Sequence, residues 1–155
     1  EARLLLTPKV FLDVLPRLLA HEDTRDPERP FVMIGRRQAR SHNSWTQNSA
    51  RLVKGRNRCT LQIHPQDARN LGISDSDSVQ VSARVGTIVL PVELTSAMAP
   101  GVVSIPQGWG QEKGQLDAAT RVQTVSINDL TDDTRVDPVS GNAAFNGVSV
   151  ALALA

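Results

Sequence analysis

The sequence predicts a mainly β fold in which short strands close into a barrel. Apolar runs of strand length recur from residue 31 onward, and turns or polar loops rich in Gly, Pro, Asn and Asp separate them. Among these runs, only residues 65–72 have the pattern of a helix. Aromatic residues make up 3% of the chain, so Val, Leu, Ile and Ala must build most of the core. Many short strands around one small helix favour a closed barrel.

The chain opens with an amphipathic helix that is expected over residues 7–20. Thr7 suits the N-cap, and Pro8 suits the first helical position. Pro16 lies inside the run and predicts a kink or an early end. One face is apolar at helical spacing: Val10, Phe11, Val14, Leu15, Leu18 and Leu19. Because this face is so regular, we expect it to pack on the barrel or on a neighbouring chain.

Segments of strand length follow a charged linker over residues 21–30. Strands are expected at residues 31–35, 59–63, 78–84, 87–94, 102–105, 122–127 and 147–154. Pro91 lies inside one of them and predicts an edge position or a bulge. The short helix at residues 65–72 ends at Gly72, a typical C-terminal stop. Residues 36–49 and 128–146 are expected to form long loops.

The net charge of +1 does not indicate a partner, but the distribution of charge does. Seven basic residues and no acidic one lie between Arg36 and Arg58, which favours an anionic ligand or partner there. Cys59 is the only cysteine, and its alternating apolar surroundings predict a packed side chain. Without a signal-peptide or membrane-spanning pattern, the expected location is cytoplasmic. Because the chain begins at Glu1, we expect a processed end or a piece of a longer protein.

The polar loop after the first strand is the first candidate binding site. It combines guanidinium groups, which bind phosphate in a bidentate manner, with groups that suit the edge and face of a heterocycle. Its members include Arg36, Ser41, His42, Asn43, Ser44 and Trp45. Together these residues suit a dinucleotide, whereas any one alone equally suits a solvated surface or, for Trp45, a core anchor.

Two further segments are weaker candidates. Gly108-Trp109-Gly110 permits close backbone approach to a planar group, although composition alone favours a tight turn covered by the indole. Asn128-Asp129-Leu130-Thr131 by itself indicates a turn and a helix cap. The three histidines have no metal spacing, and no nucleophile elbow or phosphate-binding glycine loop is present. We therefore expect this chain to bind no metal and to contain no catalytic residue.

The order and spacing of several segments carry a resemblance to a known family. They are the Leu-rich opening helix, Gly35-Arg36 with Ser41, Asn43 and Trp45, His64-Pro65-Gln66-Asp67-Ala68 with Leu71-Gly72, Val79-Gln80-Val81 with Val85-Gly86, Met98-Ala99-Pro100-Gly101-Val102-Val103, Gly108-Trp109-Gly110, Asn128-Asp129-Leu130-Thr131 and Asp137-Pro138-Val139-Ser140-Gly141. In this order they resemble the molybdopterin-dinucleotide-binding domain that ends the catalytic subunit of the dimethyl sulfoxide reductase superfamily. The resemblance covers residues 7–150.

The resemblance implies a six-stranded double-psi β-barrel over residues 31–155, preceded by a helix and linker over residues 1–30. It implies that the barrel holds bis(molybdopterin guanine dinucleotide) only together with the remaining domains of a parent oxidoreductase. By position, the cofactor contacts would be Arg36, Ser41, His42, Asn43, Ser44 and Trp45 on one side, and Gly108, Trp109 and Asn128 on the other. The basic residue that many relatives carry near the end is absent from Phe145-Asn146-Gly147, which removes one contact.

The predicted function is cofactor binding as the C-terminal domain of a larger molybdenum oxidoreductase, of the formate dehydrogenase or nitrate reductase type. In the resembled family the metal ligand lies in other domains, so the redox reaction would belong to the parent protein. Its other domains are the expected partners, and neither nucleic acid nor a membrane is. The alternative is a stand-alone interaction barrel that binds an anionic partner through the Arg36–Arg58 patch.

Overall fold

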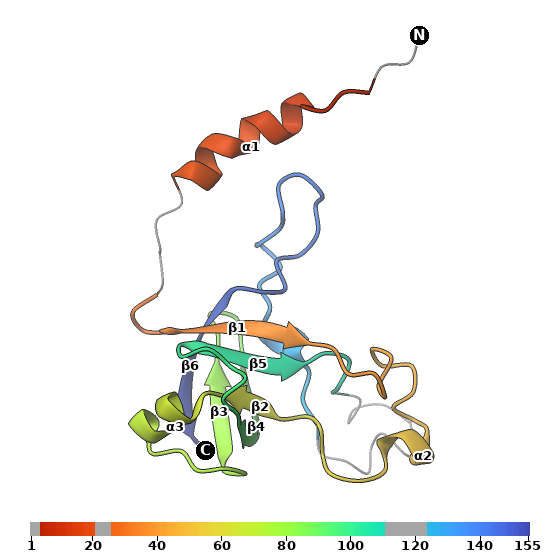
Figure 1. The fold of residues 1–155 in the computed structure, drawn as a ribbon, viewed down its shortest axis with the longest axis vertical. Helices are drawn as coiled ribbons and strands as arrows, with labels where there is room; N and C mark the ends of the chain where they lie inside the picture. The colour runs from red at the N-terminus through yellow and green to blue at the C-terminus, as the bar shows by residue number, and fades with distance from the viewer. Residues whose placement is uncertain (1–3, 21–25, 111–123) are drawn as a thin grey trace.

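The computed structural model describes residues 4–20, 26–110 and 124–155. Its strands are β1 (Phe31–Arg36), β2 (Leu61–Ile63), β3 (Ser78–Ser82), β4 (Thr87–Leu94), β5 (Val102–Pro106) and β6 (Val148–Leu154). They close into a barrel in the order β1-β5-β2-β4-β3-β6 (Figure 1). The pairs β1–β5 and β2–β4 are parallel, and the other neighbours are antiparallel. The prediction of a mainly β, closed, six-stranded barrel is confirmed.

Aliphatic side chains fill the barrel interior, and along the strands they alternate with side chains that point outward. Along β3 and β4 every second residue is buried, as expected for strands with one face on the core. Val79, Val81 and Ala83 lie on the same buried face, as predicted. The largest fully buried core side chains are Met33, Leu61, Ile63, Ile105, Ile127 and Leu130. Val and Ile thus provide most of the core, which suits a chain with few aromatic residues.

The short helix α3 (Pro65–Leu71) forms where the sequence predicts it. The His64 Nδ1 atom accepts a hydrogen bond from the Gln66 N–H at 3.1 Å, and Gly72 ends the helix with a left-handed backbone. A second short helix, α2 (Ala50–Val53), and a 3₁₀ helix, η2 (Ile127–Leu130), were not predicted. Both are only one turn long, so they leave almost no periodic pattern in the sequence.

Pro91 stands where β4 changes its ladder partner, which agrees with the predicted edge position along part of this strand. Strand β4 lies between β2 and β3 in the closed barrel. The ladder with β3 ends at the pair of Ser78 with Pro91, and the ladder with β2 begins at Val92. The proline therefore stands where pairing passes from one neighbour to the other, a position at which its missing N–H costs little.

The prediction of a strand at residues 122–127 is wrong. Residues 122 and 123 lie outside the described residues, residues 124–126 have no regular structure, and Ile127 begins η2. This segment contacts the barrel through a side chain instead of a backbone ladder: the Val125 N–H lies 3.5 Å from the Cys59 Sγ atom. The apolar residues of the segment are buried against the core without forming a strand.

The opening helix α1 (Lys9–Leu19) forms, but it does not pack on the barrel as one expected alternative required. Pro8 occupies the N-cap without a side-chain hydrogen bond, so Thr7 does not cap it, and Pro16 lies inside the helix without ending it. No residue of α1 is buried, and Phe11 is 51% exposed. Figure 1 shows α1 apart from the strands, with the loop that precedes β6 rising toward it. Packing on another chain stays a prediction.

No described helix is long and apolar enough to cross a bilayer.

Candidate functional site

Two of the predicted segments leave the barrel from neighbouring strand ends. β1 and β5 are parallel, and their pairing runs to Arg36 opposite Pro106. Parallel strands end at the same edge of a sheet, so the loop after Arg36 and the segment after Pro106 begin side by side. The Gln107 N–H donates to the Arg36 carbonyl at 2.8 Å, which extends the pairing one step into the loops. This register brings together residues that lie far apart in the sequence.

The loop after β1 folds into a turn that presents polar side chains to solvent. His42 and Asn43 both have a left-handed backbone, at φ values of 42° and 57°. The Thr46 hydroxyl donates to the Arg40 carbonyl at 2.5 Å, and the Ser41 hydroxyl donates to the Gln38 carbonyl at 3.0 Å. These bonds close the turn on itself. The residues of its outer face, His42, Asn43, Ser44 and Trp45, are all exposed.

Trp45 is the most unusual member of this exposed turn. Its side chain is 84% exposed, although burial of an indole is strongly favourable in water. The only ring that the described residues place beside it is His42, edge-on at 6.4 Å between ring centroids and an interplanar angle of 87°. The face of the indole is therefore open to stack on a planar group.

The Gly108-Trp109-Gly110 segment lies directly against this turn. A Cβ atom added at Gly108 would stand 2.3 Å from the Asn43 carbonyl oxygen and 2.9 Å from the Ser44 nitrogen. Gly108 also has a left-handed backbone, at a φ of 82°. Only glycine permits both the conformation and the close approach. The structure thus joins two of the three predicted segments through a backbone contact.

The third predicted segment joins the site through Gly110. A Cβ atom added there would stand 2.7 Å from the Cβ atom of Ser126. The Ser126 hydroxyl caps η2 by accepting the Asn128 N–H at 3.2 Å. Asn128 itself is exposed. Backbone contacts therefore connect His42–Trp45 to Gly108, and Gly110 to the segment that carries Asn128. The N-cap of η2 is Ser126, so the helix-cap signal of residues 128–131 is displaced by two residues.

Arg36, in contrast, is used inside the barrel wall. Its guanidinium donates to the Ser104 carbonyl at 3.1 Å, and to the carbonyl and hydroxyl of Thr60 at 3.0 and 3.2 Å. Burial lowers the pKa of Arg36, and the charge of Glu93 opposes that effect. These bonds tie β1 to β5 and to the chain that enters β2, so the side chain braces the barrel in this structure.

Ser41 and Trp109 also point inward. Ser41 is buried beneath the turn, and Trp109 is 8% exposed. Trp109 lines a small cavity under the loop together with Gln38, Gln47 and Leu52. Of the predicted site residues, Arg36, Ser41 and Trp109 support the site from within, whereas Trp45, Asn128 and the outer face of the turn lie on its surface.

Phe145 and Asn146 are two site neighbours that the sequence did not indicate as such. The Gly35 N–H donates to the Asn146 Oδ1 atom at 2.8 Å, and a Cβ atom at Gly35 would collide with the Phe145 ring at 2.1 Å. These residues hold the end of β1 where the loop begins. The family resemblance pointed to this stretch only for a missing basic residue, and no local pattern signals the packing against Gly35.

The basic patch is divided by the fold. Arg36 points into the wall, Arg58 donates to the Leu52 carbonyl at 3.4 Å, and Arg56 lies 3.5 Å from the Glu93 carboxylate. Arg37, Arg40, Arg51 and Lys54 remain exposed. A smaller positive surface therefore lies beside the exposed turn. Within the described ranges, no three His, Cys, Asp or Glu residues gather in a way that could hold a metal ion.

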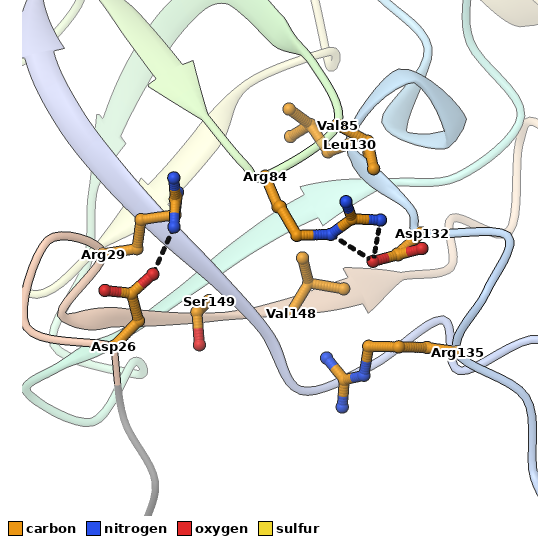
Figure 2. Close-up of a pocket in the computed structure, with 9 residues that line it drawn as sticks. All are labelled: Asp26, Arg29, Arg84, Val85, Leu130, Asp132, Arg135, Val148 and Ser149. Carbon is orange, nitrogen blue, oxygen red and sulfur yellow. Dashed lines mark hydrogen bonds and ion pairs between the residues drawn. The ribbon is translucent and has the colours of Figure 1, made fainter.

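A separate pocket of about 150 Å³ lies between η2, β6 and the turn after β3. Figure 2 shows three arginines around it, Arg29, Arg84 and Arg135. Arg29 is paired with Asp26, Arg84 lies 2.5 Å from Asp132, and Arg135 donates to the Gly147 carbonyl at 3.1 Å. Each guanidinium thus has a partner within the chain, which indicates a structural clamp between these segments.

This clamp predicts a stability change in acid. Hydrogen bonds from the Thr134 hydroxyl and N–H, and then from Arg84, lower the pKa of Asp132 to about 2. Because the folded pKa is depressed, the stabilisation is complete above the unfolded pKa of about 3.9 and is lost as the pH falls toward 2. Asp132→Asn is expected to lower the melting temperature at pH 7, with a gap to the wild type that narrows between pH 4 and pH 2. A gap of constant size would contradict this, and Asp133→Asn, at an exposed neighbour, is the control.

Fold and site together define a β-barrel domain with an exposed polar loop that packs against a glycine turn. The family model described as "Molydopterin dinucleotide binding domain" matches residues 31–149. The chain belongs to this family, which confirms the domain type that the sequence suggested.

Curated relatives agree with this assignment. The chain is 32% identical over 91 residues to the catalytic chain of a putative dimethyl sulfoxide reductase from Halobacterium salinarum, covering 58% of this chain and 10% of that protein. It is 32% identical over 92 residues to the molybdopterin-containing subunit of an arsenate respiratory reductase from Chrysiogenes arsenatis, covering 56% and 11%. For the alpha subunit of an F420-dependent formate dehydrogenase from Methanococcus maripaludis the identity is 31% over 87 residues, covering 55% and 13%. The chain thus spans about a tenth of the length of these relatives.

The fold also occurs in a solved structure. Acetylene hydratase from Pelobacter acetylenicus matches with a TM-score of 0.69 and 19% sequence identity, over 83% of this chain and 19% of that chain. At this identity the similarity concerns the fold alone.

Proposed function

We propose that this chain binds a molybdopterin dinucleotide cofactor as one domain of a larger oxidoreductase, through the exposed turn His42–Trp45, the adjoining Gly108 and the exposed Asn128. The observation that carries the proposal is the contact of Gly108 with the Asn43 backbone, which makes one surface of two segments that both resemble the family's cofactor loops. The family match and the names of the relatives support the kind of cofactor.

The chemistry of the surface suits such a ligand. The open face of Trp45 can stack on a ring system, and exposed Arg37 and Arg40 can pair with phosphate oxygens. The amide of Asn43 and the hydroxyl of Ser44 can replace the water that the polar edges of a heterocycle lose on binding. Gly108, which has no side chain, lets the Asn43 and Ser44 backbone pack against it and so fixes the turn that carries these groups. The bound cofactor supplies the redox chemistry of the parent enzyme.

Finer features of the prediction belong to this proposal. We propose the guanine form of the dinucleotide, a C-terminal position in the parent protein, and the double-psi variant of the barrel. The two parallel pairs, β1–β5 and β2–β4, support the last of these. The parent is proposed to be a molybdopterin oxidoreductase of the formate dehydrogenase or nitrate reductase type, and the other domains of that parent are the partners.

Trp45→Ala and Asn43→Asp test the proposal in the parent enzyme. Stacking on an aromatic side chain contributes about 1–3 kcal/mol, so Trp45→Ala is expected to reduce retained cofactor about tenfold. Asn43→Asp places a negative charge beside an anionic ligand while keeping a residue that tolerates the left-handed backbone, and it is expected to act in the same direction. Both residues are exposed, so the melting temperature should hardly change. Pterin content after dialysis and thermal melting are the two measurements.

The matched control is Arg69→Ala, at an exposed position on α3. It is expected to leave both cofactor content and melting unchanged. Normal pterin content in both loop variants would contradict the proposal and favour the stand-alone barrel that binds an anionic partner through its remaining exposed basic residues.

A further inference from the structure

Three residues that line one small cavity under the exposed turn each carry a buried polar atom without a hydrogen-bond partner among the described residues. These atoms are Gln38 Oε1, Gln47 Nε2 and Trp109 Nε1. Gln47 is 1% exposed and Trp109 is 8% exposed, so bulk water does not reach these groups. Buried polar atoms are almost always hydrogen-bonded, since an unpaired one is costly. Three such atoms around one space therefore point to a shared partner.

The cavity has the right size for one small molecule. Its volume is about 10 Å³, and the three residues line it together with Leu52 and Val53. A space of this size accommodates a single water molecule and nothing larger, and a buried water needs two to four polar partners. The cavity offers two donors, the Gln47 side-chain amide and the Trp109 indole N–H, and one acceptor, the side-chain oxygen Oε1 of Gln38.

The position of the cavity gives the molecule a role. Gln38 and Gln47 stand at the two ends of the exposed turn: the Ser41 N–H donates to the Gln38 carbonyl at 3.2 Å, and the Gln47 N–H donates to the Ser44 carbonyl at 3.3 Å. Trp109 belongs to the glycine turn that contacts Asn43 from the other side. A single molecule bound to all three side chains would therefore link both ends of the turn to the segment beneath it.

We propose that one buried water, held by Gln38, Gln47 and Trp109, positions the turn His42–Trp45 for its ligand, and that Gln47 is a positioning residue. The three side chains share the water as a fixed hydrogen-bond junction. This inference deepens the proposed function, because the turn is the proposed cofactor surface. The junction holds the left-handed backbone of His42 and Asn43, so less conformational freedom is lost when the ligand binds.

Gln47→Met gives opposite results with and without the water. Methionine has a similar volume and no hydrogen-bond donor, so the water loses one of its three partners. The melting temperature of the chain is expected to fall by about 3–6 °C. If no water is bound, the same change replaces an unpaired buried amide by an apolar group, and the melting temperature is expected to stay level or rise. Gln66→Met, at an exposed position on α3, is the matched control and should change little.

A second measurement observes the water directly. The Trp109 indole N–H should show a nuclear Overhauser contact to a long-lived water and slow hydrogen exchange, and both should disappear in Gln47→Met. Trp109→Phe combined with Gln47→Met should lower the melting temperature by less than the sum of the single variants, because both remove the same junction. An unaffected indole signal or fully additive effects would overturn the proposal.

The parent enzyme separates this inference from the proposed function. Gln47→Met is expected to reduce retained pterin about threefold while Gln66→Met does not. If Trp45→Ala lowers pterin and Gln47→Met leaves it unchanged, the positioning role is overturned and the cofactor surface stands. If Trp45→Ala and Asn43→Asp leave pterin unchanged, the proposed function fails, and with it the role that the water has toward the cofactor.

Discussion

Gly108→Ala is expected to cause the largest loss of cofactor from the parent enzyme, tenfold or more, together with a loss of stability. The added Cβ atom would meet the Asn43 carbonyl oxygen at 2.3 Å, where only backbone can move. The left-handed φ of 82° adds a cost of about 1 kcal/mol for alanine. Relief of the collision must displace Asn43 and Ser44, and a collision of this kind costs about 1–3 kcal/mol. Pterin content and thermal melting measure the two effects.

Gly101→Ala separates the collision from the backbone strain. Gly101 has nearly the same φ, 79°, but an added Cβ atom there meets nothing within 4 Å. It should lower stability by only about 1 kcal/mol and leave the cofactor content unchanged. Equal effects of the two substitutions on cofactor content would mean that the contact between the glycine turn and Asn43 does not shape the ligand surface.

Arg36→Ala is expected to destabilise the chain by about 2–4 kcal/mol, an effect on stability as large as that of Gly108→Ala. The guanidinium makes three hydrogen bonds to Ser104 and Thr60, and its removal leaves carbonyl groups of the barrel wall without their donor. The family resemblance implies that Arg36 contacts the cofactor. Because the guanidinium is bonded within the barrel wall, melting should fall first in Arg36→Ala, and any loss of pterin should follow from it.

Two further variants control for the loss of a surface charge and for the loss of the guanidinium group. Arg37→Ala changes the exposed neighbour and should leave stability within about 0.5 kcal/mol of the wild type. Arg36→Lys keeps the charge but lacks the planar fork, so it cannot bond Ser104 and Thr60 at once and should recover only part of the loss. A stable Arg36→Ala chain with low pterin would return Arg36 to the ligand-binding residues.

The general architecture was predictable because it depends on patterns that are local in the sequence. Alternating apolar residues mark β3 and β4, and the Pro65 to Gly72 signals mark α3 with its ends. The helix α2 and the 3₁₀ helix η2 are too short to leave a period in the sequence. Pro91 signals an interruption of strand pairing, but the ladder partners on its two sides come from other segments and leave no local pattern. The opening helix has a correct pattern, but a pattern on one element does not indicate which surface covers it.

The candidate site was predictable in composition and not in orientation. His42, Asn43 and Trp45 lie on the exposed surface that their chemistry suggested. Arg36 comes from the same short segment, yet it turns inward, because the direction of a side chain depends on the parallel pairing of β1 with β5. Trp109 is also buried, as the expected tight turn covered by the indole predicted. Gln47 lacked any distinguishing context in the sequence, and only the burial of its amide next to Trp109 indicates its role.

The parallel pairing of β1 with β5 also governs how this domain can be re-engineered. A strand rises about 3.3 Å per residue, so a shift of the β1–β5 register by one residue at Arg36 and Pro106 would move the exposed turn about 3.3 Å along Gly108. A shift of that size would break the contact of Asn43 with Gly108. Length changes at the exposed residues 54–56 do not alter that alignment and spare the cavity under the turn. Loops grafted from related proteins should therefore be tolerated around Gly55, whereas an insertion within either strand should abolish ligand recognition and preserve most of the barrel.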